Sequence, residues 1–249
     1  MTLHTNKQFD SELELIRTQL LQMGGLVESM INDAVAALVT GDMDLVARVK
    51  DREKQVNKLE VEIDERITTI LVRHQPAAID LRTLMSVTKM LTDMERSGDE
   101  AEKIANVARR IHSEDSRFVP EIEVRHMSGA VVTMLSQAMD AFARQDSVLA
   151  AQVVRSDKMV DKEWKATLRN LVTYMIEDPR VISRSIDLMF VARSIERIGD
   201  HCKNMAERVI YMVLGADVRH QGVKKTERLV RGEEENKPEG EYKPEDQAG

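Results

Sequence analysis

Two copies of one short motif bring carboxylates together. The pentapeptide Glu-Arg-x-Gly-Asp occurs from Glu95 to Asp99 and again from Glu196 to Asp200. Because the Glu and the Asp are four residues apart, they share one face of a helix, where their like charges repel each other. Carboxylate oxygens in this arrangement can bind Mg²⁺, Mn²⁺, Ca²⁺ or iron, and zinc also accepts them. The candidate metal ligands are therefore Glu95, Asp99, Glu196 and Asp200.

A second interpretation of these pairs needs no metal. Arg96 and Arg197, or basic residues of a neighbouring helix, would neutralise the carboxylates at the edge of a packing seam. Each copy also contains a glycine, Gly98 or Gly199, which costs about 1 kcal/mol relative to Ala inside a helix. The repeated glycine predicts that another helix approaches closely at both places.

The sequence carries no signature of catalysis. Neither Glu95 nor Glu196 is followed by a His three residues later, as a di-iron bundle requires. No Gly-rich phosphate loop, Gly-x-Ser-x-Gly or His-Glu-x-x-His sequence occurs. Cys202 is expected to be a small buried residue, His201 to lie at a surface or interface, and Trp164 to pack beside a seam. We therefore expect a protein that is not an enzyme.

Six long helices are expected to position the motifs. Apolar residues recur at three- and four-residue spacing, and Gly, Pro and Asp residues interrupt them. Asp42 or Asp44 is the predicted N-cap of the second helix and Asp146 that of the fifth, and Gly215 is a predicted helix stop. The resulting helices cover about residues 13–38, 45–71, 79–111, 120–144 and 147–177, and a last helix runs from the Asp178-Pro179 break to Leu214.

The second half of the chain repeats the first. Residues 42–56 align with 146–160 at an offset of 104, and residues 95–105 align with 196–206 at an offset of 101. The predicted fold class is therefore all-α, with two tandem three-helix bundles related by a pseudo-twofold internal repeat. The expected division is a first bundle in 1–113, a second bundle in 118–215, and a polar, acidic, disordered tail in 216–249.

Most of the net charge of −7 belongs to the tail. Between Gly232 and Gly249 seven acids stand against two lysines, so residues 1–231 carry about −2. A near-neutral body argues against nucleic-acid binding through a large basic face. An aromatic content of 3% excludes a β-sandwich or barrel, and a single cysteine fits a reducing compartment. Without a long apolar run or a leader sequence, the chain is expected to be soluble and cytoplasmic, with no direct membrane insertion.

These features resemble the PhoU family of phosphate-transport accessory regulators. The strings that carry the resemblance are Gln-Pro-Ala-Ala-Ile-Asp-Leu-Arg at 75–82 and Asp-Met-Glu-Arg-Ser-Gly-Asp at 93–99. In the second half they are Ile-Glu-Arg-Ile-Gly-Asp at 195–200 and Asn-Met-Ala-Glu at 204–207. The resemblance covers about residues 5–215 and leaves the acidic tail outside.

The resemblance implies a negative regulator of the phosphate-starvation (Pho) regulon. Such an adaptor would link the phosphate ABC transporter to a sensor histidine kinase, and its partners would recruit it to the inner face of the membrane. The resemblance also implies a homodimer and Mg, Mn, Fe or Zn at the Glu/Asp-x-x-x-Asp motif. One turn further on the chain has Lys103 and Asn204, which predicts fewer metals, weak binding or none. The alternatives are a structural helical scaffold with salt-bridged carboxylates and a carboxylate-metal enzyme.

Overall fold

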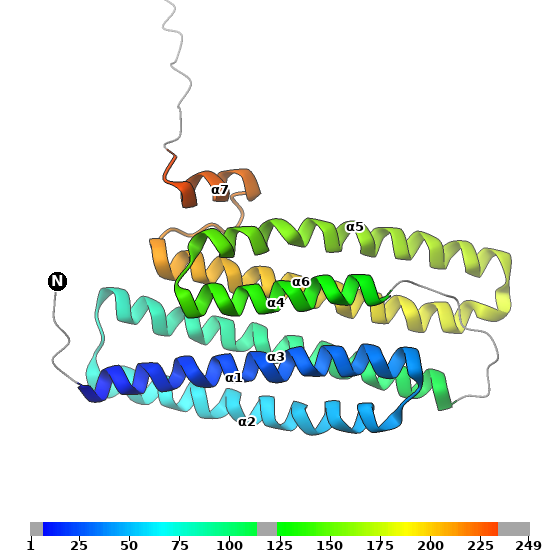
Figure 1. Cartoon of the computed structure of the whole chain (residues 1–249), viewed down its shortest axis with the longest axis horizontal. Helices are drawn as coiled ribbons and strands as arrows, with labels where there is room; N and C mark the ends of the chain where they lie inside the picture. The colour runs from blue at the N-terminus through cyan, green and yellow to red at the C-terminus, as the bar shows by residue number, and fades with distance from the viewer. Residues whose placement is uncertain (1–6, 114–123, 234–249) are drawn as a thin grey trace, which may run out of the picture.

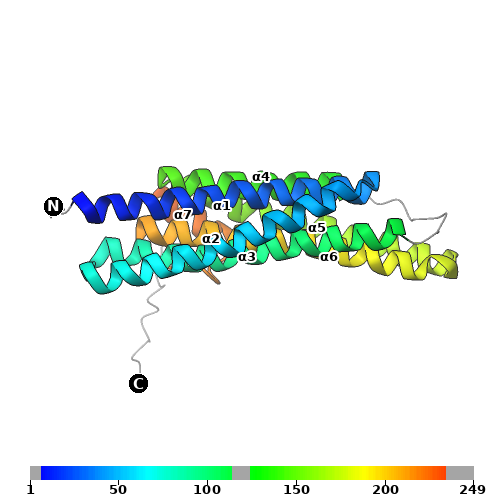
Figure 2. The same cartoon turned by 90° about the horizontal axis from the view of Figure 1, so that it is seen from below.

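The computed structural model describes residues 7–113 and 124–233. These residues are almost entirely helical and contain no strand, so the predicted all-α fold class is confirmed. The long helices run along the long axis of the molecule in both views (Figures 1 and 2). The helices are α1 (Lys7–Thr40), α2 (Met43–His74), α3 (Ala78–Ser113), α4 (Val124–Arg144), α5 (Ser147–Glu177), the 3-10 turn η1 (Pro179–Val181), α6 (Ile182–Leu214) and α7 (Val223–Arg231).

The helix ends follow the predicted capping residues. The Asp42 carboxylate accepts a hydrogen bond from the backbone N–H of Asp44 at 2.9 Å and so caps α2. Asp146 caps α5 in the same way, accepting from two backbone N–H groups at 2.9 Å. Gly215 ends α6 with φ of 74°, a left-handed conformation that glycine adopts without strain. The predicted start of the fourth helix at Pro120 lies outside the described residues.

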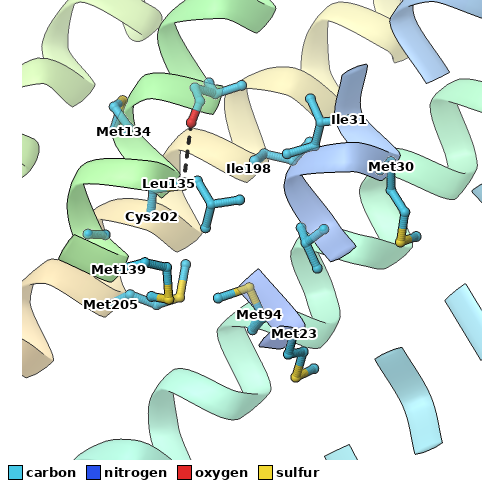
Figure 3. Packing of buried hydrophobic residues seen from close by; sticks show 14 of the residues in the cluster. Met23, Met30, Ile31, Met94, Met134, Leu135, Met139, Ile198, Cys202 and Met205 are labelled. Atoms are coloured by element: carbon cyan, nitrogen blue, oxygen red, sulfur yellow. Dashed lines mark hydrogen bonds between the residues drawn. The ribbon is translucent and has the colours of Figure 1, made fainter. Parts of the chain in front are cut away.

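The two three-helix groups lie side by side and share one core. Helices α1–α3 form one bundle and α4–α6 the other, with α3 packed along α6 and α1 against α4. Helices α2 and α5 form the two opposite edges of the molecule (Figure 1). Figure 3 shows that buried methionines of both bundles meet between the helices. These side chains include Met23, Met30 and Met94 from the first bundle and Met134, Met139 and Met205 from the second.

Among the glycines inside the helices, the tightest contact between the bundles occurs at one that the sequence patterns did not single out. A Cβ at Gly24 on α1 would lie 2.9 Å from Cγ of Met139 on α4. Gly98 and Gly199 have more room, because the nearest atoms to a Cβ there are valine methyls at 3.5 and 3.4 Å. The neighbouring helices therefore come close to Gly98 and Gly199, as predicted, but leave space for a methyl group and nothing larger.

The structure corrects the expectation of a disordered segment from residue 216 onward. Helix α7 forms within that segment and packs on α5, with Thr226 buried and Val223 and Val230 against the common core. The prediction failed because the acidic residues after Gly232 dominated the composition of the whole segment, whereas residues 223–231 have their own helical apolar spacing. The part of the tail at 234–249 lies outside the described residues.

None of the helices in the described ranges is apolar over enough of its length to cross a bilayer.

Candidate metal sites

In the first bundle, the predicted pair lies on α3 facing carboxylates of α2. Glu95 is half-buried, and burial raises the pKa of its carboxyl above the ordinary value. The negative charges of Asp99, Glu60 and Glu53 raise this pKa further, while Arg96 opposes the effect. No basic side chain of the described residues lies within ion-pair distance of Glu95 or Asp99. This cluster of acids therefore keeps its mutual repulsion.

In the second bundle, the equivalent pair lies on α6 facing α5. Glu196 is 7% exposed, and burial and then the charge of Asp200 raise the pKa of its carboxyl. The pKa of Asp200 is also raised, by burial and then by Asp157, and Asp161 adds to the effect at both groups. As the sequence predicted, the carboxylates sit at the edge of the packing seam and do not point straight into water.

Basic side chains accompany the second cluster. Arg193 donates to Glu196 Oε1 at 2.6 Å, and Lys203 Nζ donates to Asp157 Oδ2 at 2.8 Å. The Arg193 guanidinium also lies 5.9 Å from the ring centroid of Trp164. Two of the four carboxylates of this cluster are therefore partly neutralised by residues of the chain itself.

The arginines inside the motifs do not perform the neutralisation that the sequence suggested. Arg197 donates across to the other bundle, where its Nη1 lies 3.0 Å from Glu100 Oε1. Arg96 is exposed and forms no ion pair with the carboxylates of its own motif. The motif carboxylate that is paired, Glu196, is paired with Arg193 of its own helix, one turn earlier, and not with a motif arginine or a neighbouring helix.

The sequence reasoning missed half of each cluster. Glu53 and Asn57 on α2 correspond to Asp157 and Asp161 on α5 at the offset of 104 that defines the repeat. Each pair has the same four-residue spacing as Glu95 and Asp99. Searching the repeat for polar oxygen-bearing residues at this spacing on the second helix of each bundle would have found them.

One buried oxygen in each cluster has no hydrogen-bond partner. The Asn57 amide donates to Glu53, and its own Oδ1 is left without a donor. In the second cluster Glu196 Oε2 is the unpartnered atom. A buried acceptor without a partner costs free energy, and a cation relieves that cost. The donor set, carboxylate and amide oxygen only, fits a hard cation such as Mg²⁺ or Mn²⁺.

The side chains as they stand do not form a closed metal cage. Among residues 7–113 and 124–233, no three His, Cys, Asp or Glu side chains converge closely enough to hold one ion. Binding of a metal ion would therefore require the Glu and Asp side chains to adopt other rotamers, so that their oxygens converge on one point. In the second cluster it would also require Lys203 to release Asp157.

Two further residues that the sequence singled out, His201 and Cys202, have structural positions: His201 connects two helices, and Cys202 packs in the core. His201 Nδ1 lies 3.0 Å from Asp93 Oδ1 across the junction of α3 and α6, and Asn204 Nδ2 donates to the same oxygen at 3.2 Å. His201 therefore lies at an interface, as predicted. Cys202 is fully buried, and this burial raises the pKa of its thiol, so it is a packed core residue (Figure 3).

The fold and the clusters define a class of protein: a tandem of three-helix bundles with a carboxylate pair on the third helix of each bundle, facing polar oxygens of the second helix. The PhoU domain matches residues 20–108 and 124–209. The chain therefore belongs to the PhoU family, and the expected resemblance is confirmed.

Full-length relatives support this assignment. The chain is 49% identical over 236 residues to the phosphate-specific transport system accessory protein PhoU homolog of Pseudomonas aeruginosa, covering 94% of this chain and 98% of that protein. It is 41% identical over 234 residues to the phosphate-specific transport system accessory protein PhoU of Escherichia coli, covering 94% and 97% of the two chains. These relatives are named as accessory proteins, so the expectation that the chain is not an enzyme is confirmed.

Solved structures share the architecture. The crystal structure of PhoU from Pseudomonas aeruginosa superposes with a TM-score of 0.81 at 50% identity, covering 84% of this chain and 100% of that one. The phosphate transport system regulatory protein PhoU from Streptococcus pneumoniae gives a TM-score of 0.78 at 23% identity, covering 85% and 99%. The second likeness shows that the fold persists at low sequence identity.

Proposed function

We propose that the chain is a cytoplasmic accessory protein of a phosphate-specific transport system and a negative regulator of the phosphate-starvation response. In this role it links the phosphate ABC transporter to its sensor histidine kinase and keeps the kinase quiet when phosphate is ample. The observation that carries the proposal is identity of 41–49% over more than nine-tenths of relatives that are named accessory proteins of such a system.

A reporter of phosphate starvation tests the regulatory role. In cells that lack the gene, we expect the reporter to be active in phosphate-rich medium, and the full-length chain supplied in trans should restore repression. Deletion of the gene with repression intact in rich medium would overturn the regulatory role. Crosslinking of the chain to transporter and kinase subunits in the same cells separates regulation through either partner.

The carboxylate clusters add a metal to this proposal. Glu95 and Asp99 with Glu53 of α2 would hold one cation, and Glu196 and Asp200 with the α5 carboxylates would hold another. Bound Mg, Mn, Fe or Zn would supply positive charge that ties the second helix of a bundle to the third. The support is the repulsion between the acids, which basic residues relieve only in part in the second cluster, and the one unpartnered buried oxygen in each cluster.

Elemental analysis of untagged protein tests the metal. We expect bound metal in the wild type, loss of one share with Asp99→Asn, loss of the other with Asp200→Asn, and no change with Asp64→Asn. Asp64 is an exposed acid of α2 and serves as the matched control. Metal content that is unaffected by both motif variants would assign the clusters to a purely structural role.

The homodimer in this proposal would use exposed apolar residues near the two opposite ends of the antiparallel pair α3 and α6. Ile182, Ile186 and Phe190 are exposed at four-residue spacing on α6, and Leu81 and Met85 are exposed at equivalent positions of α3. Exposed apolar stripes of this kind are typical of protein interfaces. Sedimentation equilibrium should give a dimer for the wild type and a monomer for Phe190→Glu. Val72→Glu on α2, where the valine is also exposed, should remain dimeric.

A further inference from the structure

The outer edge of the second bundle carries a straight row of basic side chains. Five basic residues of α5 follow one another at alternating spacings of three and four residues, so they share one helical face. All five are exposed, and every exposed charged residue of α5 before Glu177 is basic. The row extends over about 21 Å at 1.5 Å per residue. Its members are Arg155, Lys158, Lys162, Lys165 and Arg169.

Helix α7 extends this row into a broader surface. It sits above the N-terminal half of α5 (Figure 1), and Arg155 of α5 pairs with Glu227 of α7 at 3.3 Å. Lys158 lines one concavity with three basic residues of α7, Lys224, Lys225 and Arg228, and with Glu233, and this concavity has a volume of about 740 Å³. We call the α5 row together with the exposed α7 residues the α5–α7 basic face. The α7 members are Lys224, Lys225, Arg228 and Arg231.

The internal repeat shows that this charge is not a consequence of the fold. At the offset of 104, the five positions of the α5 row correspond to positions of α2 that are also exposed and occupy the opposite edge of the molecule (Figure 1). There the two acids cancel the two lysines, and Lys54 pairs with Asp51 at 3.3 Å. These α2 residues are Asp51, Lys54, Lys58, Val61 and Glu65.

We propose that the α5–α7 basic face docks on an anionic phospholipid surface. Ammonium groups on long flexible stems suit mobile phosphate headgroups, because each acts as a point charge without fixed geometry. Two apolar side chains lie among the charges, since Met159 is 49% exposed and Leu229 is 37% exposed. The apolar side chains Val223 and Val230 hold α7 against the protein core, so its lysines and arginines face outward beside the α5 row. Clusters of about four to eight basic residues of this kind bind anionic headgroups by charge.

Other occupants of this face differ from lipid in ways that can be measured. An acidic partner protein would use the same charges, and so would the seven acids that follow in sequence from Glu233 to Asp246. The straight, lysine-rich row with exposed apolar side chains favours the lipid surface, because recognition of protein carboxylates draws on the planar fork of arginine. Lipid contact goes beyond the regulatory function proposed above, and vesicle binding is measured with the chain alone, so the two can fail separately.

Flotation of the full-length chain with vesicles tests the proposal. We expect binding to phosphatidylethanolamine vesicles that contain about 30% phosphatidylglycerol, loss of binding at about 0.5 M salt, and none to phosphatidylcholine vesicles. The pair Lys162→Gln, Lys165→Gln should lower the partition coefficient roughly tenfold or more. The matched control is Lys54→Gln, Lys58→Gln on α2, which changes the net charge equally and should lower it far less.

Four outcomes would overturn the proposal. The first is absence of vesicle binding at low salt, and the second is equal loss from the α5 and α2 pairs when both variants fold by circular dichroism. Binding that emerges only after Glu234→Gln, Glu235→Gln would assign the face to the acidic end of the chain itself. An α5 pair that leaves vesicle partition intact but releases the chain from cell membranes would assign the face to an acidic protein.

Discussion

The two carboxylate clusters occupy equivalent places in the repeat, yet they limit the repulsion of their acids differently. The first cluster has an amide, Asn57, where the second has the carboxylate of Asp161. The first cluster takes its fourth acid from Glu60 of α2, where the second bundle has Trp164. The second cluster adds Arg193 and Lys203, at positions where the first bundle has Thr92 and Glu102.

This difference means that the two clusters should respond differently to a cation. In the first cluster a metal competes with no resident basic side chain for Glu95 or Asp99. In the second it finds the same number of acids but must displace Lys203 and Arg193 from two carboxylates. Identical motifs on the third helices therefore do not imply identical sites, because the facing helix and the flanking turns set the charge balance.

The largest effect on stability is expected in the core that the two bundles share. Met30 and Met134 are equivalent at the offset of 104, and both are buried in the common core. Met30→Ala and Met134→Ala should each lower the free energy of unfolding by about 2–5 kcal/mol. Because the core is continuous, both should shift one cooperative urea transition of the whole molecule, measured by circular dichroism. Two separate unfolding transitions, each shifted by only one of the variants, would show that the bundles unfold independently. Lys58→Gln, at an exposed position of α2, is the control for non-specific effects.

Exchanging the amide and the acid should exchange the behaviour of the clusters. Asn57→Asp gives the first cluster one more carboxylate, so its affinity for Mn²⁺ should rise by roughly tenfold while metal-free stability falls by about 1 kcal/mol. Asp161→Asn should do the reverse in the second cluster. Titration calorimetry and urea unfolding in chelator measure the two quantities. Affinity that falls with Asn57→Asp would show that Asn57 Oδ1, the unpartnered atom, is itself a ligand.

The sequence was sufficient for the helices because their boundaries depend on local chemistry. Asp42, Asp146 and Gly215 cap or end helices through contacts with residues next to them in sequence, and the apolar spacing marks the buried face directly. The motif carboxylates were placed correctly at the seam for the same reason. Their partners on α2 and α5 were missed because facing residues on different helices are set by tertiary packing.

The net charge of the sequence also did not show how the exposed charges are distributed over the surface. A body of about −2 suggested a balanced surface, yet the exposed charges of α5 before Glu177 are all basic while those of α2 cancel. The acids of α5 before Glu177 are present in the count but are partly or wholly buried, as Asp157 is at 4% exposure. Helical position decides which charges a partner meets, and only the packing of the helices reveals it.

The raised carboxyl pKa values predict a pH effect that separates the acid clusters from the rest of the surface. A carboxyl whose pKa is raised by folding stabilises the fold when protonated, and this contribution is lost as pH rises through the folded pKa. In chelator, wild-type stability relative to Asp200→Asn should therefore be higher at pH 5 than at pH 7, by a fraction of 1 kcal/mol after solvent screening. Urea unfolding at both pH values measures it. A difference that does not change with pH, or has the opposite sign, would contradict a raised pKa.

Small effects on stability are expected from alanine substitutions at three helical glycines, the two motif glycines and Gly24. The sign and size of each effect should follow the space around the glycine. Gly98→Ala should raise stability by about 0.5–1 kcal/mol, because alanine favours the helix and its methyl would meet Val56 at 3.5 Å, an ordinary contact. Gly199→Ala should gain less, because Val160 lies at 3.4 Å. Gly24→Ala should lose stability, because Met139 at 2.9 Å must move and the junction of the two bundles with it. The melting temperatures of the three variants give the order. An equal gain in stability at all three would contradict the tight contact at the α1–α4 junction, because Gly24 would then accept a methyl group as easily as the motif glycines do.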